Sequence, residues 1–600
     1  MADIQYTILP IDGLGHYFEV ELLISKPNPT GQRIQMPNWI PGSYMTRDFA
    51  KNILSLHAFR QDKSQAFKQP LHLLQTNSDT WEIEATDGPV LIQSKIYAFD
   101  NSVRTAFLDT ERAFFNFSSL CFQVVDQTHK PIDCFLQNTS LTKTWEVITT
   151  LPSKKIDQRG FGLYYAPQYD ALIDHPVSLG RFSKVAWQSF GIPHQIVFQG
   201  VVNPLNLALL KEDLKAICDT HIAFFDPSHH VAPFTEYVFH VNVVGNGYGG
   251  LEHRSSTALI CKRSDLPYTN QLAQASELKA YQDFLGLCSH EYFHSWMVKK
   301  VQPLAFQPYR LNQRNFTKLL WLFEGFTSYY DDLQLFRSRR IDRTTYLQRI
   351  LDTYHQVLKN PGRLHQSVAQ SSFTAWTKYY LMDENTPNSV VSYYAKGSLI
   401  AFALDILIRD FSMQEKSLDD VMRMLWQEHG AYGDDVGIGL TDNGLDKVLN
   451  KCLGSSFSPL WLAFKSAYID GTQDVDVIQL MQSVGISLNL KKVSEAEKIQ
   501  QSLGVRTLTQ DGFIRVTHVL EGYLGQIAGL CPNDLIIALN DEKVSSANWT
   551  QLLTRYASKK TTLIVFRSDL LKKLVLQLPS KTALSDPKLQ TYELVNDEVC

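Results

Sequence analysis

The chain of 600 residues is too long for a single hydrophobic core and is expected to fold as several domains. Its composition, with 44% hydrophobic, 12% aromatic and 20% charged residues, is that of a globular protein and excludes an intrinsically disordered chain. The formal net charge is -4, and Lys and Arg are scattered, so there is no electrostatic reason to expect nucleic acid or a membrane surface as a partner.

The first residues, MADIQYTILP, contain no basic segment followed by an apolar run, so no secretory signal is predicted. No stretch approaches the ~18 apolar residues of a transmembrane helix. The eight cysteines lie far apart and form no CxxC pair, which is typical of reduced thiols. These observations favour a cytoplasmic protein. A chain trimmed of its signal peptide would look the same and would be periplasmic.

Residues 1–178 are predicted to form a β-rich domain. Segments such as HYFEVELLI (16–24) and DTWEIEA (79–85) combine aromatic and β-branched residues with partial alternation. Pro, Gly, Asn and Asp separate such segments at short intervals. A β-sandwich is the usual way for these strands to bury one face.

Residues 179–488 are predicted to form one domain that begins as mixed α/β and becomes mostly helical. Segments 194–200 and 235–245 have the composition of strands, and segment 205–225 between them has helical spacing. Two long helices are predicted over residues 277–300 and 317–336, and more helices follow. The lysines that end the first of these suit a helix C-terminus.

Residues 489–585 are predicted to form a separate β-rich module. Short strands at 513–520, 534–540 and 562–568 alternate with Gly-containing turns, and one helical segment lies at 546–557. Residues 586–600 are polar and are predicted to be a tail. The chain is therefore expected to be a multidomain α+β protein.

His290-Glu291-Tyr292-Phe293-His294 is an HExxH motif within the first long predicted helix. Residues i and i+4 lie one turn apart on a helix, so both imidazoles can bind one metal ion. Glu291 lies about 100° further round the helix. It is therefore expected beside the ion, as a general base, and not on it. HExxH fixes only three positions and also occurs by chance, so the helical context carries this interpretation.

A catalytic zinc site needs a third protein ligand and one open position. Glu324, in WLFEGF (321–326), is the candidate, because a carboxylate inside an apolar helical segment is costly to bury without a partner. Asp331 could accept a hydrogen bond from a ligating histidine. The alternatives are a surface glutamate at 324 and a solvated acidic turn at 331 and 332. This ligand set favours one Zn²⁺ per chain.

The reaction expected of such a site is hydrolysis of a peptide bond. Zinc makes hydroxide available near neutral pH, and Glu291 would move the proton from water to the leaving amine. A further group should stabilise the oxyanion. Tyr394, in SYYAKG (392–397), is the candidate, because a phenol donates a hydrogen bond without carrying charge. The alternative is that two adjacent tyrosines near a helix start only pack.

Gly249, Gly250 and Glu252 lie in the glycine-rich segment GNGYGGLEH (245–253), which follows a predicted strand. Glycines let a substrate backbone approach closely, and a strand edge can pair with an extended peptide. Glu252 could then bind a free α-ammonium group and make the enzyme an aminopeptidase. The alternative is a glycine-rich hairpin with a solvent-facing glutamate.

HExxH followed by WLFEGF resembles the gluzincin metallopeptidases, in which two His and a downstream Glu bind zinc. GGLEH (249–253) resembles the exopeptidase motif of the large alanyl-type aminopeptidases, and YAKG (394–397) is similar to their Y-x-K-G segment. The resemblance implies a thermolysin-like catalytic domain, an ammonium-binding role for Glu252 and a transition-state role for Tyr394.

Over about residues 1–585 the chain is similar to the glycyl aminopeptidase family, which carries a C-terminal PDZ domain. The resemblance rests on PNWIPGSY (37–44), PGR (361–363) and SSFTAW (371–376). It implies cleavage of N-terminal Gly and Ala from peptides. Met297 stands where the family pattern leads us to expect Asn, which leaves the zinc site intact.

DGFIRV (511–516) and AGLCPNDLI (528–536) resemble a circularly permuted PDZ domain of the bacterial type. Leu503, Gly504 and Val505 are then the candidate carboxylate loop, whose N–H groups would hold a peptide C-terminus by strand addition. The alternative is a structural domain that binds nothing.

The sequence therefore predicts a zinc aminopeptidase that acts on peptides with a free N-terminus. Two alternatives remain open. A zinc endopeptidase would follow if Glu252 did not face the substrate. A PDZ-centred peptide-binding scaffold would follow if the peptidase site were vestigial, although the intact zinc ligands and Glu291 count against this.

Overall fold

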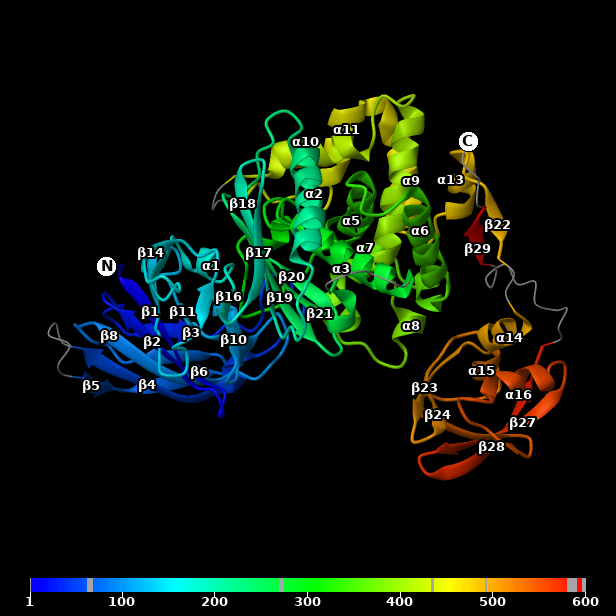
Figure 1. Cartoon of the computed structure of the whole chain (residues 1–600), viewed down its shortest axis with the longest axis horizontal. Coiled ribbons are helices and arrows are strands. Elements are labelled where there is room, and N and C mark those ends of the chain that lie inside the picture. Colours follow the sequence, from blue (N-terminus) through cyan, green and yellow to red (C-terminus); the bar gives the residue numbers. More distant parts are fainter. Residues whose placement is uncertain are drawn as a thin grey trace. The chain divides into compact units, whose positions relative to one another are not determined.

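The structure is a computed structural model that describes residues 2–61, 68–268, 275–432, 436–491, 494–579 and 591–595. Figure 1 colours the chain from blue at the N-terminus to red at the C-terminus. The chain divides into two compact units. The first consists of Met1–Asn315, Tyr330–Ile341 and Asp419–Val448, and the second of Phe316–Tyr329, Asp342–Leu418 and Leu449–Cys600. The predicted domain boundaries near 178 and 488 stay predictions.

The first part of the chain is β-rich, as the alternating segments predict. Residues of strand β2 (Tyr17–Ile24) alternate between buried and half-buried, because successive side chains of a strand point to opposite faces. Its eight-stranded sheet has the order β14 (Ser153–Ile156), β15 (Gly162–Ala166), β12 (Ile132–Leu136), β1 (Ile4–Asp12), β2 (Tyr17–Ile24), β8 (Val90–Tyr97), β4 (Ile53–Gln61), β5 (Lys68–Leu71).

Two four-stranded sheets complete this β-rich part. Their orders are β13 (Glu146–Ile148), β16 (Val177–Gly180), β10 (Arg112–Phe115), β9 (Ala106–Leu108), and β11 (Gln123–Val124), β3 (Gln32–Gln35), β7 (Thr80–Ile83), β6 (Leu73–Asn77). A short helix, α1 (Tyr169–Leu172), precedes β16. The β-rich character is thus established, whereas the sandwich arrangement stays a prediction.

A five-stranded sheet and two helices carry the candidate site. The sheet has the order β17 (Ser183–Ser189), β18 (Ile192–Gln199), β19 (Tyr237–Val244), β21 (Ser256–Lys262), β20 (Gly249–Glu252). Strands β18, β19 and β21 run parallel, and β20 is antiparallel to β21 at the edge. The predicted helix between β18 and β19 is α2 (Leu207–Phe225).

The first long helix is shorter than predicted. The apolar spacing predicts a helix to residue 300, but α3 (Ala275–Phe293) ends at Phe293. Val298 has a φ of 82°, which no helix can accommodate, and its N–H donates to the Val301 carbonyl. Lys299 and Lys300 are consequently buried and do not form an exposed basic helix end.

The second long helix is interrupted at Glu324, which separates α4 (Leu320–Phe323) from α5 (Gly325–Arg337). Gly325 lies so close to α9 (Ala395–Phe411) that a Cβ atom on it would be 2.6 Å from the Cα of Gly397. Because neither glycine has a side chain, the backbones of α5 and α9 come into direct contact next to Glu324.

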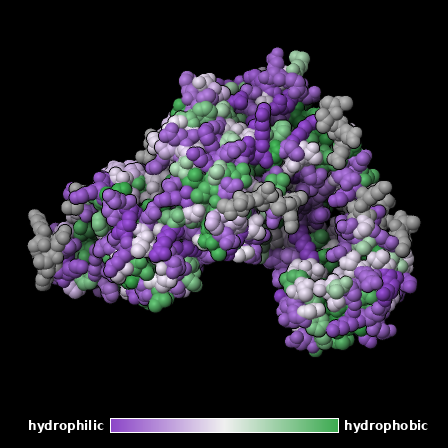
Figure 2. Space-filling model, in the orientation of Figure 1, coloured by the Kyte–Doolittle hydropathy of each residue, from purple (hydrophilic) through white to green (hydrophobic). Residues whose placement is uncertain are grey.

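The remaining helices of this part of the chain lie within residues 179–488, where the sequence predicts a mostly helical fold. Their bounds are α6 (Arg343–Leu358), α7 (Val368–Phe373), α8 (Thr386–Ser389), α10 (Leu418–His429), α11 (Gly444–Leu453), α12 (Ser458–Phe464) and α13 (Val477–Ser483). Among the residues that the structure describes, no helix is long and apolar enough to span a membrane. Figure 2 shows hydrophilic residues over much of the visible face, with hydrophobic residues among them.

The C-terminal module has a β-sheet with its own core, which includes Ile499, Val516 and Leu563. Its elements are α14 (Glu495–Leu503), β23 (Val505–Gln510), β24 (Phe513–Val519), α15 (Leu524–Ile527), β25 (Leu535–Leu539), β26 (Glu542–Lys543), α16 (Trp549–Arg555), β27 (Lys560–Arg567) and β28 (Leu570–Gln577). The sheet order is β23-β24-β25-β27-β28, with β26 paired to β25, so β23 lies at an edge.

Part of the predicted tail is ordered into a strand. β29 (Tyr592–Leu594) pairs antiparallel with β22 (Leu488–Leu490). Residues 586–590 and 596–600 lie outside the described residues.

Candidate metal centre and active site

The three predicted metal ligands come together in the structure. One ligand atom each from His290, His294 and Glu324 lies within 4.8 Å of the other two. The Nε2 atoms of the two histidines are 3.1 Å apart. Ligands bound to zinc at ~2.0–2.1 Å in a tetrahedron are separated by roughly 3.4 Å, so the cluster has the dimensions of a zinc site. Glu324 is only 3% exposed, which excludes the alternative of a surface glutamate.

Asp331 orients His290. Its Oδ2 atom is 2.9 Å from His290 Nδ1, which leaves Nε2 for the metal. The Asp331 carbonyl accepts a hydrogen bond from Ser289 Oγ at 2.9 Å, and this hydroxyl is in turn 2.9 Å from His221 Nε2. Burial lowers the pKa of His221 to about 3, so this imidazole is neutral. Asp331 therefore lies where a carboxylate partner of His290 is predicted, and its role behind a bound metal stays a prediction.

His294 is oriented by a main-chain group. Its Nδ1 lies 3.1 Å from the carbonyl oxygen of Met297, in the turn that follows α3. A carbonyl accepts the ring N–H whatever side chain it belongs to. This explains how Met can stand at a position where the family pattern leads us to expect Asn. The contact was not predicted, because a backbone partner leaves no signal in the residue type.

Replacing Asp331 by Asn is expected to weaken zinc binding by about 10- to 100-fold, because an amide is a weaker acceptor for His290 and makes it a poorer ligand. Titration of the apoprotein with zinc against a chromophoric chelator measures this change. The matched variant Asp352→Asn, at an exposed position of α6, should bind zinc like the wild type. Unchanged zinc affinity of Asp331→Asn would contradict the role assigned to this carboxylate.

The candidate general base lies against strand β20. Glu291 is buried, with 5% exposure. A Cβ atom on Gly250 would be 2.2 Å from Glu291 Oε1, so the carboxylate occupies the space that any larger residue at 250 would need. The glycine-rich segment therefore allows the backbone of an edge strand to approach the HExxH helix, whereas its composition predicts the approach of a substrate backbone.

Glu252 lies on the same face of β20 as Gly250, because residues i and i+2 of a strand share a face. The residue is 5% exposed, and its Oε1 has no hydrogen-bond donor among the described residues. A Cβ atom on Gly42, which has a φ of +94°, would be 2.6 Å from both carboxylate oxygens. The PNWIPGSY segment thus packs its main chain directly against Glu252.

Buried ion pairs fix the chain just beyond Glu252. Asp174 Oδ1 is 2.6 Å from Lys299 Nζ and 3.4 Å from His253 Nδ1, and Asp174 Oδ2 is 3.3 Å from Arg254 Nε. Burial raises the pKa of Asp174, but Lys299, His253 and Arg254 outweigh it and hold that pKa well below its usual range. The ionised carboxylate anchors this end of β20 and explains the buried lysine after α3.

Tyr394 directly precedes α9 and lies among other tyrosines. Its ring centroid is 5.8 Å from that of Tyr379. Burial raises the pKa of Tyr379, a hydrogen bond with Ser392 opposes this rise, and the negative charge of Glu324 adds to it. A Cβ atom on Gly325 would be 2.8 Å from the Tyr393 carbonyl oxygen. Glu324 precedes Gly325 and Tyr394 follows Tyr393, so each lies one residue from this contact. The transition-state role of Tyr394 stays a prediction.

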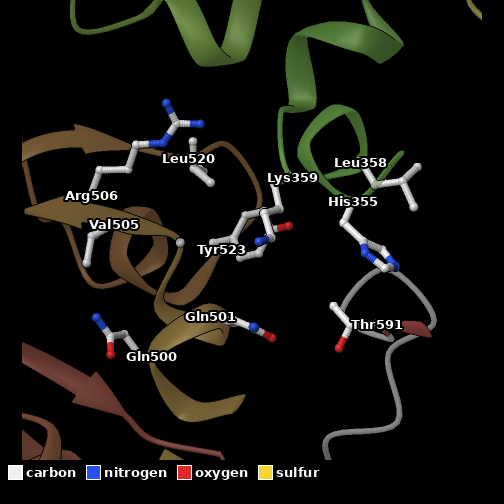
Figure 3. Close-up of a pocket in the computed structure, with 11 residues that line it drawn as sticks. His355, Leu358, Lys359, Gln500, Gln501, Val505, Arg506, Leu520, Tyr523 and Thr591 are labelled. Atoms are coloured by element: carbon white, nitrogen blue, oxygen red, sulfur yellow. The ribbon is translucent and has the colours of Figure 1, made fainter. Parts of the chain in front are cut away.

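The predicted carboxylate loop is the end of a helix. Leu503 is the last residue of α14, and Gly504 has a left-handed φ of 60°. The Gly504 N–H donates to the Gln501 carbonyl at 3.0 Å and so caps the helix. A pocket of about 160 Å³ beside this turn is lined by Gly504, Val505 and Arg506 and, at the C-terminal end of α6, by His355, Leu358 and the following Lys359 (Figure 3). Peptide binding at Leu503, Gly504 and Val505 stays a prediction.

Comparisons with known proteins place the chain in a family. The profile of the Peptidase M61 N-terminal domain matches residues 5–181, and that of M61 glycyl aminopeptidase matches residues 283–400. The crystal structure of an aminopeptidase N family protein from Idiomarina loihiensis is 36% identical, with a TM-score of 0.89 over 99% of this chain and 98% of that one. None of the curated proteins matches in sequence at a significant level.

Two more distant structures also match part of the chain. An M1 zinc metallopeptidase from Deinococcus radiodurans is 12% identical, with a TM-score of 0.44 over 77% of this chain and 93% of that chain. Yeast LTA4 hydrolase is 11% identical, with a TM-score of 0.45 over 77% of this chain and 67% of its own. These likenesses are too low to bear on function, whereas the identity to the Idiomarina protein over nearly the whole chain is decisive. The chain belongs to the M61 glycyl aminopeptidase family and is a metallopeptidase.

Proposed function

We propose that the protein is a zinc aminopeptidase that removes Gly and Ala from the free N-terminus of peptides. The candidate metal site supports zinc, since two imidazoles and a carboxylate are the ligand set of catalytic zinc sites. The preference for small residues is proposed from membership of a glycyl aminopeptidase family.

The placement of Glu252 carries the aminopeptidase proposal. Glu252 lies on the same face of β20 as Gly250, and a Cβ atom placed on Gly250 would point at Glu291. Its buried Oε1 lacks a donor among the described residues, and a substrate ammonium would supply one. The main chain at Gly42 packs against this carboxylate. A substrate that extended past its amine would therefore clash with the PNWIPGSY segment. These features disfavour an endopeptidase.

The residues of the site then have separate tasks. Zinc held by the three ligands would supply the Lewis acidity that makes hydroxide available near neutral pH. Glu252 binds the α-ammonium group and sets the register of the substrate. Glu291 accepts a proton from water and delivers it to the leaving amine. Tyr394 donates a hydrogen bond to the oxyanion that develops on the substrate carbonyl oxygen.

The test of this proposal is hydrolysis of glycyl, alanyl and leucyl p-nitroanilides by the wild type and by Glu252→Gln, with and without chelator. We expect chelator-sensitive release from the glycyl and alanyl substrates. Loss of one partner of a buried charge pair costs about 2–5 kcal/mol, so Glu252→Gln should lower kcat/KM at least about 30-fold. Glu212→Gln, whose side chain is 74% exposed, is the matched control and should leave kcat/KM unchanged.

Two outcomes would contradict the proposal. Cleavage of N-blocked peptides with kcat/KM equal to that of free ones would favour an endopeptidase. Full activity of Glu252→Gln on free glycyl substrates would remove the carboxylate from the amine site.

A further inference from the structure

Arg104 extends from the β-rich part of the chain to the edge strand of the candidate active site. It lies in the loop between β8 and β9, and its Nη2 donates to the Gly250 carbonyl at 2.7 Å. Its Nη1 is 4.0 Å from the position that a Cβ atom would take on Gly249. Because β20 is the last strand of its sheet, the guanidinium lies along the edge where an extended substrate would run.

This guanidinium has no acidic partner among the residues that the structure describes. Its Nε is buried without a hydrogen bond, and Nη2 bonds only the neutral Gly250 carbonyl. By contrast, Arg60 in the same β-rich part pairs with Asp87 at 2.9 Å. A half-buried cation without a counter-ion is unfavourable, and arginine matches a carboxylate with two parallel hydrogen bonds. A carboxylate supplied from outside the chain would provide this partner.

The loop that carries Arg104 is held in place by its own polar groups. Ser102 N–H donates to Asp100 Oδ1 at 2.9 Å, and Arg104 N–H donates to Ser102 Oγ at 3.2 Å. Thr105 Oγ1 donates to the Asp100 carbonyl at 3.2 Å. These bonds fix the backbone at Arg104 before any ligand binds, which is how binding residues are preorganised.

The spacing along β20 fits a short peptide. Glu252 and Gly250 are two residues apart, which spans ~7 Å of strand. A dipeptide has about the same length, since each extended residue covers ~3.3–3.6 Å. An ammonium at Glu252 and a carboxylate at Arg104 would leave the scissile bond between them, on the Glu252 side of Gly250. Glu291 lies against that residue.

We propose that Arg104 binds the α-carboxylate of the substrate, and that the preferred substrates are dipeptides with both ends free. This inference rests on the proposed aminopeptidase function and adds the second recognition point. Arg104 is then a specificity residue, and longer or C-terminally blocked peptides are poorer substrates because they bring no carboxylate to it.

The test compares glycyl-leucine with glycyl-leucine amide, which differ only in the terminal charge. A hydrogen bond to a charged group contributes about 1.5–3 kcal/mol, so wild-type kcat/KM should be at least about 10-fold higher for the free acid. Arg104→Gln should bring this ratio to about 1, and Arg104→Lys should keep a preference for the acid. The control Arg60→Gln should keep the wild-type ratio.

The possible contrary results are distinguishable. A wild-type ratio near 1 would overturn the inference. An unchanged ratio in Arg104→Gln, with both substrates slowed equally, would show that Arg104 only holds the Gly250 carbonyl and would overturn it too. Absence of glycine release from both peptides by the wild type would overturn the proposed function, and this inference with it.

Discussion

Replacement of Glu291 by glutamine is expected to lower kcat by about 10²- to 10⁴-fold, the usual contribution of a general base. The amide has nearly the shape of the carboxylate, but it cannot accept the proton from water. Glu291 is not among the three residues of the candidate metal cluster, so zinc content should stay at the wild-type level. KM should change little, because the lost interaction belongs to the transition state.

Measurement of kcat and KM on glycyl p-nitroanilide, together with the zinc content by atomic absorption, checks this prediction. The matched control is Glu277→Gln, an exposed residue in the first turn of the same helix, α3, and it should behave like the wild type. Retention of more than a tenth of the wild-type kcat by Glu291→Gln would show that another group serves as the base.

Replacement of His294 by alanine is expected to remove both the zinc and the activity. His294 is 1% exposed, offers one of the three ligand atoms, and is held by the Met297 carbonyl. Replacement of a residue that only hydrogen-bonds to a zinc ligand weakens zinc binding by roughly 10- to 100-fold. Loss of a ligand itself should weaken zinc binding more than this. The variant should contain little zinc after purification and show no measurable release of p-nitroaniline.

Thermal unfolding separates loss of metal from loss of fold. Zinc that binds only the native state at 1,000 times its Kd stabilises that state by about 4.1 kcal/mol. A chelator should therefore lower the Tm of the wild type, whereas the Tm of His294→Ala should already be low and should not respond. His229→Ala, with a side chain 80% exposed, is the control and should respond like the wild type. One tightly bound zinc in His294→Ala would contradict the ligand assignment.

The metal ligands could be predicted because local periodicity decides their geometry. His290 and His294 are one helical turn apart, and the helix that carries them, α3, is present at those positions. Glu324 could be predicted from cost, since a carboxylate in an apolar segment needs a partner when buried. The glycines of segment 245–253 predict only that a substrate backbone can approach closely, so the close approach of the edge strand β20 to Glu291 was not predicted.

The ends and breaks of the helices could not be predicted, because distant residues decide them. The helical pattern continues to Lys300, but the left-handed turn at Val298 and the buried pairing of Lys299 with Asp174 end the helix early. The break at Glu324 accompanies the contact between Gly325 and Gly397, which are far apart in sequence. Propensity describes neighbours along the chain and carries no information about such contacts.

Two other features were not predicted. No sequence pattern marks Arg104, whereas a sequence pattern does mark helix α14. Arg104 occurs in a polar loop far from every motif, so only the structure brings it to Gly250. The helix α14, in contrast, begins with a capping box of Ser494 and Glu497, and this pattern predicts a helix running toward the supposed loop at Leu503.

The measurement that tests the central claim most directly is mass spectrometry of two peptides incubated with the zinc-loaded protein. The peptides are glycyl-alanyl-leucine and its N-acetylated form. We expect release of free glycine from the first, inhibited by chelator, and no cleavage of the second, because the acetyl group removes the ammonium that Glu252 binds. Cleavage of both peptides at equal rates would contradict the aminopeptidase account, and so would cleavage of the free peptide that survives complete removal of the metal.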